Sequence, residues 1–82
     1  MQAIKEEYNL DEQAKRIGLI VGVSNEIYFR SISHISDVYV EFIKGQWVAW
    51  RESYVPNTNQ RSSYKLITQG NFELVMARVK NY

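Results

Sequence analysis

The stretch from Val38 to Trp50, VYVEFIKGQWVAW, limits what this chain can fold into more than any other part of it. It is the longest run dense in β-branched and aromatic residues, which favour strands. Side chains alternate on either side of Gly45, and two such runs joined by a short glycine-containing turn predict a β-hairpin. We expect Val40 and Phe42 to face the core, and Gly45 to adopt a positive φ or to lie beside a residue that does.

The chain before this hairpin carries the signals of a helix. Asn9 and Glu12 have the spacing of a capping box, in which the first side chain accepts from a free N–H and the glutamate reaches back. Leu10 and Ala14 fall on one face, which can dock on a sheet. Gly18 suits the left-handed position that ends a helix. We therefore expect a short N-terminal helix.

Leu19–Val23 is a short apolar run that predicts a buried strand, but two later segments fit either a strand or a helix. Residues 27–35, IYFRSISHI, have apolar residues at both spacings, and their β-branched and aromatic content favours a strand. Residues 72–80 follow Gln69–Asn71, which is typical of a hairpin turn, so we predict another strand there. The alternative is a C-terminal helix capped by Asn71.

Length and composition set the fold class. Eighty-two residues are enough for one domain, which we place at residues 1–82. The expected fold is α+β, with an N-terminal helix packed on a twisted antiparallel sheet of about five strands that can curl into a small SH3-like or Sm-like barrel. The chain has no cysteine and no apolar run near the ~18 residues of a membrane span. We therefore expect a cytoplasmic protein without a membrane partner.

A polar stretch from Ser53 to Ser63, SYVPNTNQRSS, is the second unusual feature. It exceeds the usual connection of roughly 4–6 residues, and long polar loops in small domains are often functional. Trp47 and Trp50 lie three positions apart, so in a strand one faces the core and the other can anchor a partner, unless the N-terminal helix covers it. The binding residues that we predict are Trp50, Arg51, Tyr54, Asn57, Asn59, Arg61 and Tyr64.

Residues that could carry catalysis are few. His34 is the only histidine, and Ser33, Ser36 and Asp37 are its neighbours in sequence. Sequence neighbours rarely form a triad, because nucleophile, base and orienting group must converge from different elements. One imidazole without thiolates argues against zinc, and no glycine-rich phosphate loop is present. The sequence indicates neither an enzyme nor a cofactor or metal site.

Residues Gly22–Arg30, GVSNEIYFR, resemble the second half of a helix-turn-helix: a turn glycine, a small apolar residue, a capping serine and a recognition helix. The resemblance covers nine residues and implies a DNA-binding helix over Asn25–Arg30. Gly18 stands where the motif has alanine, four residues before the turn glycine. A helix-turn-helix-like DNA binder is therefore the lesser alternative.

The net charge of +1 lacks the strong basic excess of a dedicated nucleic-acid binder. We expect a small non-catalytic protein-binding module, an inhibitor or adaptor that occupies a partner protein's surface. Small stand-alone proteins of this kind often serve as inhibitors or adaptors, including those carried by phages and mobile elements. The alternative is a weak single-stranded nucleic-acid-binding small β-barrel with exposed aromatic rings. Its cations would be Arg30, Lys44, Arg51, Arg61 and Lys65.

Overall fold

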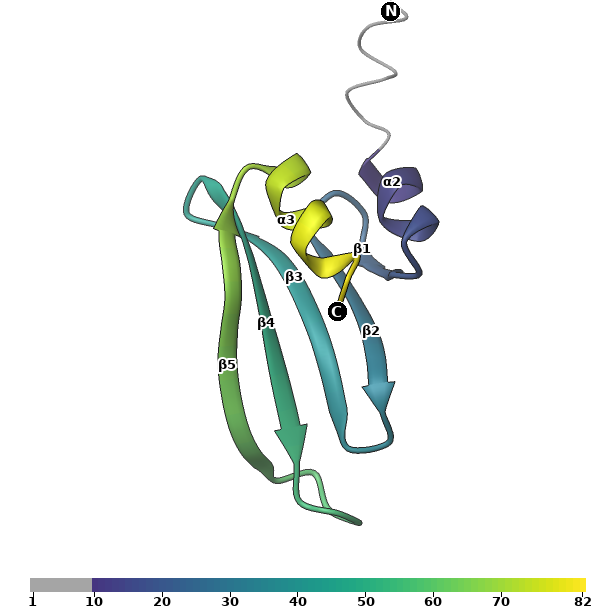
Figure 1. The fold of residues 1–82 in the computed structure, drawn as a ribbon, viewed down its shortest axis with the longest axis vertical. Helices are drawn as coiled ribbons and strands as arrows, with labels where there is room; N and C mark the ends of the chain where they lie inside the picture. The colour runs from purple at the N-terminus through teal and green to yellow at the C-terminus, as the bar shows by residue number, and fades with distance from the viewer. Residues whose placement is uncertain (1–9) are drawn as a thin grey trace, which may run out of the picture.

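One antiparallel sheet of five strands and two short helices make up the computed structural model, which describes residues 10–82 (Figure 1). The elements in chain order are α2 (Leu10–Arg16), β1 (Ile20–Val23), β2 (Ile27–Ser33), β3 (Ser36–Ile43), β4 (Gln46–Tyr54), β5 (Arg61–Gly70) and α3 (Phe72–Val79). The α+β class, the helix before the sheet and the five antiparallel strands are as the sequence predicts. The helix after the sheet is not.

The central hairpin is formed by β3 and β4, as predicted. Lys44 and Gly45 join the two strands with φ angles of 51° and 86°, and Ile43 pairs with Gln46 across the turn. Two positive φ angles in a two-residue link are typical of a type I′ turn, whose twist matches that of the strands beside it. The positive φ expected at Gly45 is confirmed.

The sheet is open, so the expectation that it curls into a small barrel is wrong. Its strands lie in chain order from β1 to β5, and each pairs only with its neighbours along the chain. A closed barrel needs its first and last strands to pair. Here β1 has 4 residues and β5 has 10, and Figure 1 shows them at opposite edges.

Residues 72–79 form a helix, and the prediction of a strand at 72–80 is wrong. The Asn71 side chain caps α3 by accepting from the backbone N–H of Leu74 at 2.8 Å. The buried side chains of α3 form one stripe at helical spacing: Phe72, Val75, Met76 and Val79. The helix is more stable than a strand here because it directs all four side chains to the sheet, whereas a strand would direct only alternate residues there.

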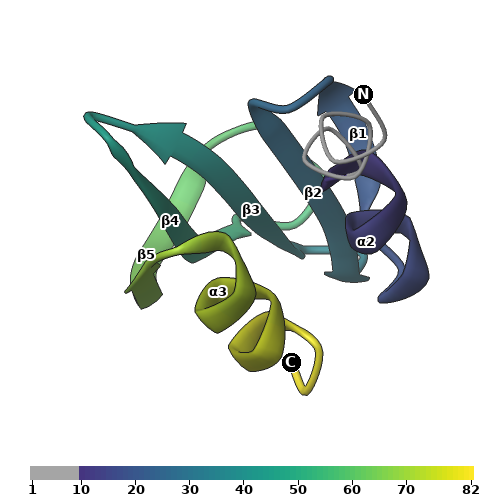
Figure 2. The same ribbon diagram turned by 90° about the horizontal axis from the view of Figure 1, so that it is seen from above.

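Both helices pack on the same face of the sheet, which we call the inner face (Figure 2). Val38, Val40 and Ala49 on this face have no exposed surface. The burial of Val40 is therefore confirmed. Phe42, two positions further along β3, points to the same face, and its ring centroid lies 5.3 Å from that of Trp47. Phe42 is nevertheless 48% exposed, so it faces the core side of the sheet as expected but is not buried.

Aromatic side chains fill the core between the sheet and α3. The ring of Trp47 lies 4.9 Å from that of Phe72 and 5.8 Å from that of Tyr28, between centroids. Trp47 is 7% exposed and Tyr28 is fully buried. These distances are typical of favourable aromatic pairs. Trp47 is therefore the tryptophan that anchors the core.

α2 ends at the glycine that the sequence marks. Gly18 has a φ of 89° and donates its N–H to Lys15, while Leu19 donates to the carbonyl of Ala14 at 3.0 Å. These bonds are those of a Schellman motif, which satisfies the last carbonyls of a helix. Asn9, the predicted cap at the other end of α2, lies outside the described residues.

β2 occupies the position of the helix that the helix-turn-helix resemblance implies. Ile27–Ser33 is a strand, and residues 24–26 form the turn between β1 and β2. The resemblance is therefore wrong for this fold. The strand prediction for residues 27–35 is confirmed over β2.

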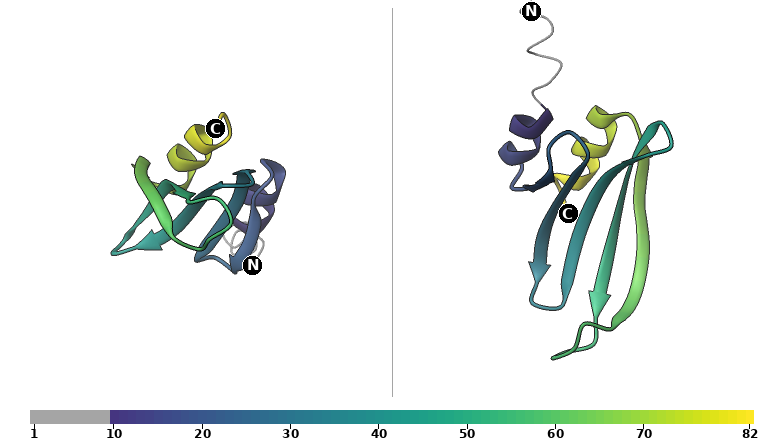
Figure 3. Two further views of the ribbon diagram at one scale, coloured as in Figure 1. Left: turned by 90° about the horizontal axis from the view of Figure 1, so that it is seen from below. Right: turned by 180° about the vertical axis from the view of Figure 1, so that it is seen from behind.

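The lower half of the sheet in Figure 1 extends beyond the helices. This half ends at two connections, residues 34–35 between β2 and β3 and residues 55–60 between β4 and β5 (Figure 3). The second connection is shorter than the predicted Ser53–Ser63 loop, because β4 continues to Tyr54 and β5 begins at Arg61. Residues that look like a loop in the sequence are thus strand ends with fixed faces.

Candidate functional site

The outer face of the sheet, opposite the helices, carries one apolar side chain from every strand in a single line. The register pairs Ile20 with Phe29, Phe29 with Tyr39, Tyr39 with Trp50, and Trp50 with Leu66. We call these five side chains the central row. No helix within residues 10–82 covers it (Figure 2), and Ile20 and Leu66 are 56% and 47% exposed.

Four aromatic rings follow one another along this row, and three of them are stacked. The ring centroids of Phe29 and Tyr39 are 6.5 Å apart, and those of Tyr39 and Trp50 are 5.5 Å apart at an interplanar angle of 24°. Tyr64, diagonal to Trp50, extends the stack at 6.2 Å. Trp50 is therefore the outward tryptophan, and no described helix covers it. Stacking holds these rings in place, so the surface is preorganised for contact.

A hydrogen-bonded chain of polar groups lies beside the central row. The hydroxyl of Tyr39 is 3.2 Å from Asp37 Oδ2 and 2.8 Å from the hydroxyl of Tyr54. The Tyr54 hydroxyl is in turn 3.2 Å from Glu52 Oε1, and the indole N–H of Trp50 donates to Glu52 Oε2 at 2.8 Å. Two carboxylates from neighbouring strands are thus linked through two phenols.

Burial raises the pKa of Tyr54 above its ordinary value, and its contacts with Tyr39 and Glu52 raise it further. Burial also raises the pKa of Tyr39, although the hydrogen bond with Tyr54 acts in the opposite direction. Both phenols therefore keep their protons at neutral pH. Each has one proton to donate, so two protons serve three contacts. When the 2.8 Å contact between the two hydroxyls holds a proton, two arrangements remain: Tyr39 donates to Tyr54 and Tyr54 donates to Glu52, or Tyr54 donates to Tyr39 and Tyr39 donates to Asp37.

Charges in the strands are separated by face. Every acidic strand residue points to the outer face: Asp37, Glu41 and Glu52. Three of the four basic strand residues share one register line with buried Val38 on the inner face: Arg30, Arg51 and Lys65. Only Arg61, paired with Tyr54, joins the outer face. The outer face is therefore both aromatic and acidic.

The structure brings together four of the predicted binding residues and separates three. Trp50, Tyr54, Arg61 and Tyr64 all lie on the outer face or at its edge. Arg51 lies on the inner face, because adjacent strand residues point to opposite sides, and it donates to Ser36 Oγ at 3.3 Å. Its placement in one surface with Trp50 is therefore wrong. The other two predicted residues lie in the β4–β5 connection: Asn57 and Asn59.

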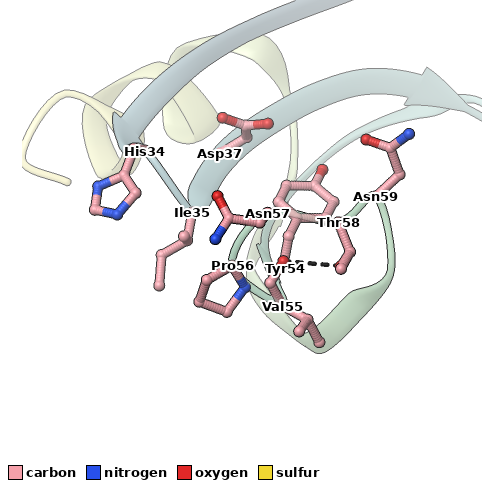
Figure 4. Close-up of a pocket in the computed structure, with 9 residues that line it drawn as sticks. All are labelled: His34, Ile35, Asp37, Tyr54, Val55, Pro56, Asn57, Thr58 and Asn59. Atoms are coloured by element: carbon pink, nitrogen blue, oxygen red, sulfur yellow. Dashed lines mark hydrogen bonds between the residues drawn. The ribbon is translucent and has the colours of Figure 1, made fainter.

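Asn57 and Asn59 line a hollow of about 880 Å³ at the lower end of the sheet (Figure 4). Its walls come from the β2–β3 turn, which contributes His34, and from the β4–β5 connection, where Thr58 Oγ1 donates to the carbonyl of Val55 at 2.8 Å. Asp37 and Tyr54 also line the hollow. Because both belong to the polar chain beside the central row, the hollow continues the outer face.

Sequence reasoning missed Ile20, Phe29, Glu52 and Leu66 as members of this surface. Period-2 alternation from Trp50 leads to Glu52 within β4, so that residue could have been found. The other three come from β1, β2 and β5, and only the strand register aligns them with Trp50.

Within residues 10–82 no group of three or more His, Cys, Asp or Glu side chains is placed to hold a metal ion. None of the described helices is long and apolar enough to cross a membrane. Comparisons with protein-family models, with curated proteins and with solved structures found no match. The function of this chain is therefore inferred from its geometry.

Proposed function

We propose that this chain is a non-catalytic protein-binding module, an inhibitor or adaptor, that binds its partner with the outer face of its sheet. The observation that carries the proposal is the central row, with stacked rings and exposed aliphatic ends that no helix of residues 10–82 covers. A sheet normally buries one apolar face against a second layer, and the two helices of residues 10–82 occupy only the inner face. Exposed apolar surface with aromatic anchors is typical of protein interfaces.

The charges of the outer face define the kind of partner. Three carboxylates at Asp37, Glu41 and Glu52 stand against the single guanidinium of Arg61. A second copy of this chain would bring the same carboxylates together, which is unfavourable in a twofold interface. A different protein with basic residues around an apolar patch is complementary to this face.

Single-stranded nucleic acid is the second candidate, because stacked rings on an open sheet can also stack bases. Phosphates, however, need cations beside those rings. The cations Arg51 and Lys65 lie on the inner face, and Arg30 is engaged with the carbonyls of Ile17 and Val79 at 2.6 and 3.2 Å. We therefore expect no binding to 20-nucleotide single-stranded DNA or RNA tighter than about 10 μM at physiological salt, measured by fluorescence anisotropy.

Adjacent residues on opposite faces provide matched variants for testing the protein-binding proposal. Trp50→Ala and Leu66→Ala alter the central row, whereas Arg51→Ala and Lys65→Ala alter the inner face one position away. With the tagged full chain and a partner captured from cells that express it naturally, the outer-face variants should weaken binding by at least about 1–2 kcal/mol, roughly tenfold. The inner-face variants should bind like the wild type.

Circular dichroism and urea denaturation confirm that each variant is folded before binding is compared. Equal losses in outer-face and inner-face variants would contradict the proposal. Sub-micromolar binding to single strands with a steep salt dependence would favour the nucleic-acid candidate instead. A concentration-dependent dimer that Leu66→Ala abolishes would assign the face to a second copy.

A further inference from the structure

One cluster on the outer face is already arranged around a cation. Arg61 Nη1 lies 3.5 Å from Glu52 Oε2, and its Cζ lies 5.5 Å from the centroid of the Tyr64 ring. The ring of Trp50 stacks against Tyr64 at 6.2 Å, and its indole N–H donates to the same Glu52 oxygen at 2.8 Å. A carboxylate beside two aromatic rings therefore faces a guanidinium, which is a favourable setting for carboxylate pairing and for a cation–π contact.

The carboxylate of Glu52 is held in place more firmly than the guanidinium of Arg61 that pairs with it. Glu52 is oriented by the indole N–H of Trp50 and by the hydroxyl of Tyr54 at 3.2 Å, and its side chain is 19% exposed. Arg61 reaches Glu52 only at the outer limit of a hydrogen bond, and its side chain is 55% exposed. It is also the first residue of β5 after the connection from Val55 to Gln60. Arg61 can therefore leave while the site keeps its shape.

We propose that Glu52, Trp50 and Tyr64 form a recognition site for an arginine side chain of the partner protein, and that Arg61 occupies this site when the partner is absent. The inference rests on the proposed function, because it takes the occupant from a protein bound to the outer face. Arginine is favoured over lysine, since a planar guanidinium stacks on rings and presents a fork of donors to a carboxylate.

A small arginine probe tests the site on the full chain. N-acetyl-arginine amide is titrated into the ¹⁵N-labelled protein, and the Trp50 indole N–H signal is followed by NMR because that group touches Glu52 directly. In Arg61→Ala the probe should bind at least threefold tighter than in the wild type, since the internal competitor is gone. N-acetyl-lysine amide should bind more weakly than the arginine probe to the same variant.

The matched control is a second carboxylate on the same face. In the Arg61→Ala background, Glu52→Gln should abolish the shift of the Trp50 signal, whereas Glu41→Gln should leave it unchanged, provided that both spectra show a folded chain. Equal affinity of the wild type and Arg61→Ala, or equal effects of the two glutamine variants, would overturn the inference. If Trp50→Ala abolishes capture of the partner but the arginine probe does not bind, only this inference is overturned. If the arginine probe binds but outer-face and inner-face variants capture the partner equally well, only the proposed function is overturned.

Discussion

Asp11 connects three separate parts of the described fold through its side chain. Its carboxylate accepts from Ser24 Oγ at 2.5 Å, from the backbone N–H of Asn25 at 3.0 Å and from the hydroxyl of buried Tyr28 at 2.6 Å. The hydrogen bonds from Ser24 and Tyr28 lower the pKa of Asp11 below its ordinary value of 3.8. One carboxylate thus ties α2 to the β1–β2 turn and to the core.

Asp11→Ala should lower the free energy of unfolding by about 1–3 kcal/mol at pH 7, because the buried Tyr28 hydroxyl loses its acceptor. The pKa of Asp11 is lower in the folded state, so its contribution is full above pH 3.8 and is lost as the pH falls through the folded value. Urea denaturation of both proteins at pH 7 and near pH 3 should show the difference shrinking in acid.

Glu12→Ala is the matched control for Asp11→Ala. Glu12 is 55% exposed, and its ion pair within residues 10–82 is with Lys15 at 3.5 Å, so its removal should cost less than about 0.5 kcal/mol. Equal costs at both positions, or a difference that does not depend on pH, would contradict the role of Asp11.

Among the elements, α3 determines which face of the sheet is buried and which is exposed. It covers the inner face over Trp47 and Ala49, which are nearly or fully buried, and leaves the outer face uncovered. Its beginning depends on two neighbouring residues. Gly70 has a φ of 147°, which side chains rarely adopt, and Asn71 caps the first turn. The direction that the chain takes at Gly70 therefore selects which face remains available.

Asn71→Ala should destabilise the fold by about 1 kcal/mol, because a free N–H at the start of α3 loses its acceptor. Asn71→Asp preserves a side-chain oxygen at the cap and should keep the wild-type midpoint in thermal denaturation. If the alanine variant also kept the wild-type midpoint, the cap would contribute nothing to the position of α3.

The whole molecule has two different halves. Near the helices, the sheet is buried on its inner face, whereas the lower half extends to the hollow with no described helix on either face (Figures 1 and 3). The central row belongs to the outer face near Trp50, and the hollow lies further along at Asn57 and Asn59. These two regions can be altered separately.

Replacement of residues 57–60 by Asn-Gly should change stability by less than about 1 kcal/mol, since loop-closure entropy varies slowly with length. The fold is checked by urea denaturation and partner binding by the capture assay described for Trp50→Ala. Binding should be retained, because the central row is untouched. A folded variant that lost the partner would instead place the contact at the hollow, with Asn57 and Asn59 as contributors.

The sequence alone determined the parts of this fold that depend on neighbours along the chain. The central hairpin, its turn at Gly45 and the helix end at Gly18 follow from alternation and from backbone angles that glycine adopts without strain. The opposite directions of Trp47 and Trp50 follow from the period of a strand. The polar link after β4 was recognisable too, although its bounds were too wide, because strand pairing extends into polar residues.

Tertiary structure decided the rest. Residues 72–79 have both spacings in their sequence, and the sheet face beneath α3 selected the helix because it buries one continuous stripe. The central row exists only through the register of five strands, which aligns Ile20 with Leu66 although they lie 46 positions apart in the chain. The composition of the central row depends on which strands pair with each other and in which register. Local sequence patterns do not contain that information.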